Sequence, residues 1–160
     1  MRRRLPLLLG LGLLLAGCGG DDAPTIDLGA MVEYPCGYGF WLGSPDDDVA
    51  VHLSADHALA AADDLPATAT LPDPAWTGTV QVGRNLHANW CNDVFVPPEP
   101  RIDEEWEIVA GTVTVEPSTG DCQDGRLGRV DDLVARRPDG DEVALGGRDV
   151  ANGGWGCFAG

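Results

Sequence analysis

The stretch "EEWEIVAGTVTVEP", residues 104–117, decides the fold because it carries the strongest strand pattern in the chain. Branched and aromatic residues alternate with polar ones, as in a strand that buries one face. The apolar positions change phase between Ile108 and Val113, and Gly111 lies at the break. We therefore expect one long strand with a β-bulge near Gly111.

Shorter segments of the same kind lie on both sides, separated by Pro, Gly and Asp turn signals. The one helical candidate lies at residues 54–64, where Ser54 could be the N-cap, and we expect one or two helical turns or an extended loop there. The pattern predicts an all-β domain, either an antiparallel β-sandwich of immunoglobulin-like architecture or a small β-barrel. Further strands are expected at residues 39–44, 49–54, 67–71, 77–86, 130–137 and 142–147.

The chain opens with "MRRRLPLLLGLGLLLAGC", in which three arginines precede an apolar run at residues 5–15. This is the layout of a secretory signal peptide. Eleven helical residues rise only about 16 Å, roughly half of a ~30 Å hydrocarbon core. We therefore do not expect this run to span a membrane.

The last four residues of that segment, "LAGC" at 15–18, resemble the lipobox of bacterial lipoprotein precursors. The resemblance covers only the first 18 residues and implies cleavage before Cys18, whose thiol then carries a diacylglycerol, with acyl chains such as palmitate. It implies a partner, the lipid bilayer, and a place on the extracytoplasmic face of a bacterial membrane. Gly19 follows the cysteine, so an Asp retention signal is missing and the choice between inner and outer membrane stays open. The implied organisation is a signal peptide at 1–17, a flexible acidic tether at 18–30 and one β domain at 31–160.

The mature chain would be strongly acidic. It has seven arginines and no lysine against 26 acidic residues, a formal net charge of −19. Such a charge argues against nucleic acid as a partner and favours a solvated surface or cation binding.

Four cysteines remain once Cys18 is lipidated, an even number that indicates two disulfides in an exported chain. Three pairings are possible. We favour Cys36–Cys157 and Cys91–Cys122, because the first pair joins two similar aromatic, Gly-rich segments at the two ends of the domain.

Two groups of residues could bind metal. His52, Asp56 and His57 lie within six residues and could form a zinc site with His87, although they match no ligand motif. Aspartates cluster in three turns and could bind Ca²⁺, although the EF-hand pattern is absent. These aspartates are Asp46, Asp47, Asp48, Asp121, Asp124, Asp139 and Asp141.

Five tryptophans are many for a domain of this size. A tryptophan packed in the core is the ordinary role, and an exposed ring that stacks on a glycan or a protein partner is the functional one. Trp76, between two turn signals, is the best candidate for exposure, followed by Tyr38 and Trp155 in Gly-rich segments.

No G-x-S-x-G or S-x-x-K motif is present, and we assign no catalytic residue. The leading hypothesis is a non-enzymatic, membrane-anchored module that binds a ligand or an envelope protein. The alternatives are a metal-dependent hydrolase using His52, Asp56 and His57, and a structural protein of envelope assembly.

Overall fold

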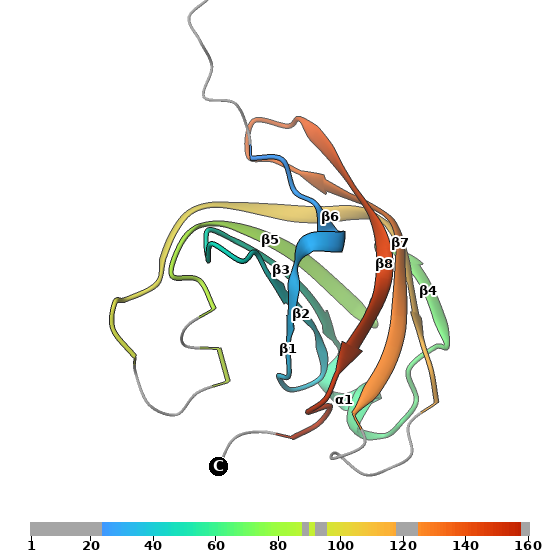
Figure 1. Cartoon of the computed structure of the whole chain (residues 1–160). Helices are drawn as coiled ribbons and strands as arrows, with labels where there is room; N and C mark the ends of the chain where they lie inside the picture. Colours follow the sequence, from blue (N-terminus) through green and yellow to red (C-terminus); the bar gives the residue numbers. More distant parts are fainter. Residues whose placement is uncertain (1–23, 88–89, 92–95, 118–124, 158–160) are drawn as a thin grey trace, which may run out of the picture.

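A computed structural model describes residues 24–87, 90–91, 96–117 and 125–157. All eight strands belong to one antiparallel sheet in the order β1-β2-β3-β5-β6-β7-β8, with β4 also pairing with β6. The sheet curls into a half-barrel around one interior (Figure 1). The elements are η1 (Leu28–Ala30), β1 (Val32–Tyr34), β2 (Gly39–Gly43), β3 (Val49–Ala55), α1 (His57–Ala61), β4 (Thr68–Leu71), β5 (Trp76–Arg84), β6 (Arg101–Val115), β7 (Arg126–Arg136) and β8 (Glu142–Asn152).

The prediction of an all-β antiparallel fold is confirmed. The immunoglobulin-like sandwich is not observed, because a continuous path of paired strands runs from β1 to β8 instead of two stacked sheets. The strand pattern could not decide this point, since both architectures bury alternate residues of short antiparallel strands.

β6 is the predicted long strand, and its pairing with β7 shifts register on both sides of Ala110. These irregularities lie beside Gly111, where the sequence predicts a bulge. They bring Trp106, Ile108 and Val113 to the same interior, where all three are buried. β6 begins at Arg101, directly after the Pro-rich residues 96–100.

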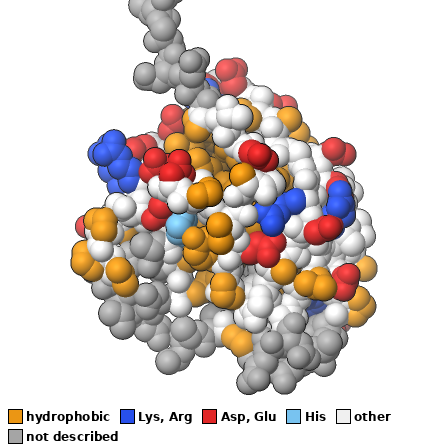
Figure 2. All heavy atoms as spheres, viewed as in Figure 1, with side chains coloured by type: hydrophobic (Ala, Val, Ile, Leu, Met, Phe, Trp, Pro, Cys, Tyr) orange, Lys and Arg blue, Asp and Glu red, His pale blue; other side chains and the backbone are white. Residues whose placement is uncertain are grey.

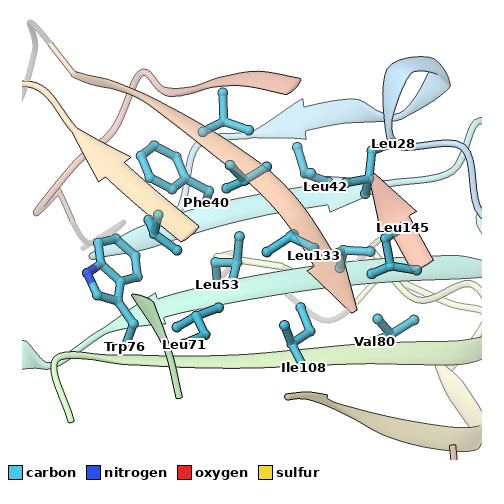
Figure 3. Packing of buried hydrophobic residues seen from close by; sticks show 14 of the residues in the cluster. Leu28, Phe40, Leu42, Leu53, Leu71, Trp76, Val80, Ile108, Leu133 and Leu145 are labelled. Atoms are coloured by element: carbon cyan, nitrogen blue, oxygen red, sulfur yellow. The ribbon is translucent and has the colours of Figure 1, made fainter. Parts of the chain in front are cut away.

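The interior is packed with aliphatic and aromatic side chains (Figure 3). At one end, Phe40 and Trp76 stack with their ring centroids 5.9 Å apart, and Trp155 packs 5.6 Å from Phe40. The Arg126 guanidinium lies 5.1 Å from the Trp155 ring and 3.0 Å from an Asp63 oxygen, which covers this end of the core.

Two side chains of β8 close the curled sheet, because no ladder joins β1 to β8 in the described part of the chain. The Asn152 amide group is buried and hydrogen-bonds the backbone of Cys36, Gly37 and Gly39 at 2.7 to 3.2 Å. Arg148 donates to the carbonyl oxygens of Leu28 and Met31, both at 2.7 Å, and to Glu33 at 3.1 Å. Polar side chains therefore replace the missing backbone ladder.

The segment before β1 is part of this closure. Leu28 is 1% exposed and Ile26 9% exposed, so both belong to the core although they lie in the predicted tether at 18–30. The packed core therefore begins before residue 31, where the β domain was predicted to start. Among the described residues, no helix has the length and apolar character needed to cross a membrane.

The helical candidate at 54–64 forms the short helix α1, of the one or two turns expected there. β3 continues through Ala55, and the Asp56 carboxylate accepts a hydrogen bond from the Leu59 N–H at 3.0 Å. Asp56 is therefore the N-cap of α1, and the prediction of Ser54 is wrong because Ser54 pairs with Thr77 in the sheet.

The favoured disulfide pairing is also wrong, since Cys36 is bonded to Cys91 with a Cα–Cα distance of 5.5 Å. Gly156 donates a hydrogen bond to the Gly37 carbonyl, so the two Gly-rich segments are neighbours as expected. The loop after β5 nevertheless brings Cys91 to Cys36. Cys157 is also disulfide-bonded, and Cys122 lies outside the described residues.

We predict that Asn152→Ala lowers the free energy of unfolding by about 3 kcal/mol, because it leaves several buried backbone groups unpaired. Asp149→Ala is the control on the same strand. It removes an exposed ion pair with Arg129 and should cost less than about 1 kcal/mol. Urea unfolding of both variants measures the difference, and equal losses would contradict the closing role of Asn152.

Candidate functional site

The residues predicted to bind zinc are not gathered into one metal site in the described part of the chain. The His52 ring packs 4.3 Å from Trp41 on the outer face of the sheet, and the His57 ring packs 5.2 Å from Tyr38. The Asp56 carboxylate caps α1. His87 lies 2.9 Å from Asp47. No group of three His, Cys, Asp or Glu residues suited to a metal ion occurs within the described segments.

The aspartates predicted to bind calcium mostly organise turns. An Asp47 oxygen accepts a hydrogen bond from the His87 backbone, and Asp139 accepts one from the Asp141 backbone. Asp46 and Asp48 are exposed in the β2–β3 turn. Asp121 and Asp124 lie outside the described residues.

The expected exposure of Trp76 is wrong, because this side chain is only 3% exposed. The first residues of β5 alternate with Trp76, Gly78 and Val80 facing the interior, which carries the indole into the core. Trp155 is buried at 5% exposure, and Tyr38 is half-buried 5.9 Å from the Trp155 ring. These three residues therefore do not form an exposed platform.

Trp76 nevertheless lines a hollow in the sheet, which we call the wedge. β5 pairs with β6 up to Glu107, and β4 pairs with the same edge from Gly111 onward. Between these two ladders the chain leaves β6 in a turn containing Pro72 and Pro74. The result is a cavity of about 570 Å³ in the wall of the half-barrel.

The wedge has an apolar floor and a polar mouth. Its buried lining comes from Leu71, Trp76 and Ile108, which also belong to the core (Figure 3). A Cβ on Gly78 would lie 2.8 Å from the Ile108 Cβ, so only glycine fits there without displacing Ile108. The polar lining residues are Asp73, Thr77, Thr79 and Glu107, and the exposed Pro72 and Pro74 complete the mouth. A concave apolar surface with a few polar groups is the usual form of a small-molecule site.

Two polar groups at the wedge could bind a ligand. Across the residues that the structure describes, no ion pair or hydrogen bond engages the exposed Glu107 carboxylate. Its cross-strand neighbour Arg136 instead contacts Glu142 at 2.9 Å. The Trp76 indole nitrogen is also buried without a hydrogen-bond partner, which is uncommon for a buried donor.

A second hollow of about 640 Å³ lies over β7 and β8, beside Leu127. Its arginines are already paired, Arg129 with Asp149 at 2.8 Å and Arg148 with Glu33 at 3.1 Å. The wedge is the better candidate because three of its lining residues, Leu71, Trp76 and Ile108, belong to the core, whereas in the second hollow only Val150 does.

The sequence did not reveal an aromatic cluster on the outer face of β1–β3, formed by Tyr34, Trp41, His52, His87 and Trp90. Tyr34, Trp41 and His52 are cross-strand neighbours in one row. The loop after β5 adds Trp90, whose ring lies 4.6 Å from His52 and 5.3 Å from Trp41. Alternation along β2 and β3 indicates that Trp41 and His52 face outward. No local sequence pattern indicates that Trp90, in the loop after β5, packs against them.

Burial in this cluster lowers the pKa of His52 from 6.5 to about 4, although the nearby Glu105 opposes the shift. The His52 Nε2 and Trp41 Nε1 atoms are buried without hydrogen-bond partners. His52 is therefore neutral at physiological pH. The Cys36–Cys91 disulfide ties the covering loop to the β1–β2 connection next to the cluster.

No protein-family model, curated protein or solved structure matches this chain.

We predict that His52 makes the fold less stable as the pH falls from 6.5 toward 4. In that window the unfolded chain binds a proton at His52 and the folded chain does not, which is worth up to about 3 kcal/mol. His52→Phe keeps a ring and removes this proton. Urea unfolding at pH 7 and pH 4.5 should show that the variant loses less free energy of unfolding between these pH values than the unmodified chain. The carboxylates are common to both chains, so their contribution cancels in this comparison. Parallel pH profiles would contradict the burial of a neutral His52.

Proposed function

We propose that this chain is a lipoprotein, anchored through Cys18 on the extracytoplasmic face of a bacterial membrane, whose β domain binds a small ligand in the wedge. The observation that carries the binding function is the wedge itself, a cavity of about 570 Å³ with a core-derived apolar floor and a polar mouth. Its volume falls in the range of roughly 300–1,000 Å³ that is typical of ligand pockets.

Anchoring is supported by the N-terminal sequence, which combines arginines, a short apolar run and "LAGC" at residues 15–18. The Cys36–Cys91 disulfide supports an oxidising compartment outside the cytoplasm. The net charge of −19 for residues 18–160 supports a soluble domain held at the membrane by its lipid, because such a surface is repelled by anionic headgroups.

A binding role fits the described residues better than the metal-dependent hydrolase, since His52 and His57 have separate aromatic neighbours. An assembly role in the envelope would need a partner surface. The largest exposed apolar side chains, among them Val32, Ile102 and Leu127, come from different strands and do not favour one docking face. Ligand binding is therefore the function that the geometry supports best.

Anchoring predicts that Cys18→Ser abolishes incorporation of radiolabelled palmitate in a lipoprotein-processing bacterium, because the variant lacks the acceptor thiol. The Cys36–Cys91 disulfide should still form, as non-reducing peptide mapping would show. Equal palmitate labelling of the Cys18→Ser variant would contradict the proposed anchor.

Binding in the wedge predicts a specific response to 2-phenylethanol, a neutral probe with an aromatic ring. Titration of the mature chain should shift the backbone amide signals of Gly78 and Ile108 in NMR spectra. Thr77→Trp places a large ring at the exposed mouth and should weaken this binding at least tenfold.

Thr68→Trp is the matched control. Thr68 and Thr77 are both exposed strand residues with one long hydrogen bond, of 3.4 Å and 3.5 Å respectively, but Thr68 lies outside the wedge. It should bind the probe like the unmodified chain. Absence of shifts at the wedge, or equal binding by both variants, would overturn the proposed function.

A further inference from the structure

We propose that the ligand of the wedge is a hydrophobic amine, with an apolar body against the floor and a cationic head at the mouth. This inference rests on the proposed function and adds the chemical class of the ligand. It is carried by the juxtaposition of an unpaired carboxylate, Glu107, with the buried surface of Ile108 on the adjacent residue of β6.

The mouth carries negative charge only. Two of the described lining residues are acidic, Asp73 and Glu107, and none is basic or a histidine. The Asp73 carboxylate is held in place by the Ala75 N–H at 2.8 Å. Glu107 projects from the outer face opposite Thr79, its partner on β5. An ammonium group at the mouth would thus meet carboxylate and hydroxyl oxygens, which accept hydrogen bonds from it.

The nearest arginine does not neutralise this mouth. Arg136 is the cross-strand partner of Glu107, but its guanidinium is held by Glu142 on β8 at 2.9 Å. The Glu107 carboxylate is exposed and has no ion-pair partner among the described residues, so it is free to attract a cation. A ligand ammonium would supply the charge that no protein side chain provides here.

The floor selects the other end of the ligand. Leu71, Trp76 and Ile108 are only 5%, 3% and 4% exposed, so the apolar surface open to a ligand comes from small parts of these side chains and from the exposed Pro72 and Pro74. Burying this surface favours an apolar partner. A dry cavity of roughly 150 Å³ accepts one benzene ring. The wedge, at about 570 Å³, therefore has room for a ring with an aliphatic arm.

Anionic ligands are disfavoured by the whole surface as well as by the mouth. Acidic side chains are scattered over the visible face, with only a few basic ones between them (Figure 2). The net charge of −19 for residues 18–160 raises the local concentration of cations and lowers that of anions. A hydrophobic amine matches the apolar floor, the acidic mouth and the negative charge of the surrounding surface.

The test compares three probes of similar size on the mature chain: 2-phenylethylamine, 2-phenylethanol and 3-phenylpropanoate. NMR titration followed at Gly78 and Ile108 gives each affinity at low salt and at 0.5 M NaCl. We expect the amine to bind about fivefold more tightly than the alcohol at low salt, and the carboxylate to bind most weakly. The preference should shrink with added salt because the charges are near the surface.

Glu107→Gln should remove most of the preference for the amine while leaving the affinity for the alcohol unchanged. Glu116→Gln makes the same change in net charge at an exposed residue outside the wedge and should keep the preference. If the amine and the alcohol bind equally to the unmodified chain, or if Glu107→Gln keeps the preference, the inference is overturned while the proposed function stands. If none of the three probes shifts the wedge residues, the proposed function itself fails.

Discussion

The closure of the sheet by Asn152 is the interaction on which the rest of the structure depends. A curled sheet with two free edges exposes its core unless the edges are joined, and here no ladder joins β1 to β8 among the described residues. The amide of Asn152, 1% exposed, instead satisfies backbone groups of Cys36, Gly37 and Gly39. This contact fixes the β1–β2 connection, and with it the position of Cys36 for its disulfide with Cys91.

The wedge follows from a second constraint, the length of β6. Its 15 residues are too long for β5 to pair with alone, so β4 takes the far part of the same edge. The turn between β4 and β5 leaves the sheet near Ile108, so core side chains line the gap between the two strands. A site formed in this way needs no loop to close over it, since its floor is the packed interior and its mouth consists of strand residues.

Alternation, turn residues and the glycine in β6 were sufficient to predict an all-β domain, most strand positions and the bulge. They describe local conformation, whereas the half-barrel depends on contacts between distant segments. Asn152 lies 116 residues from Cys36, and no sequence pattern around either residue indicates that the two are in contact. The turn signals around Trp76 mark the turn between β4 and β5, but the strand phase buries the ring instead of exposing it. The disulfide could not be predicted because it depends on how the loop after β5 folds back.

A crystal structure of the mature chain grown with 2-phenylethylamine tests most directly the central claim that the split between β4 and β5 is a binding site. The account predicts electron density for the ring against Leu71 and Ile108, with the ammonium nitrogen within hydrogen-bond distance of Glu107. A wedge closed by the turn at residues 72–75, or an amine seen only at other surfaces, would contradict it.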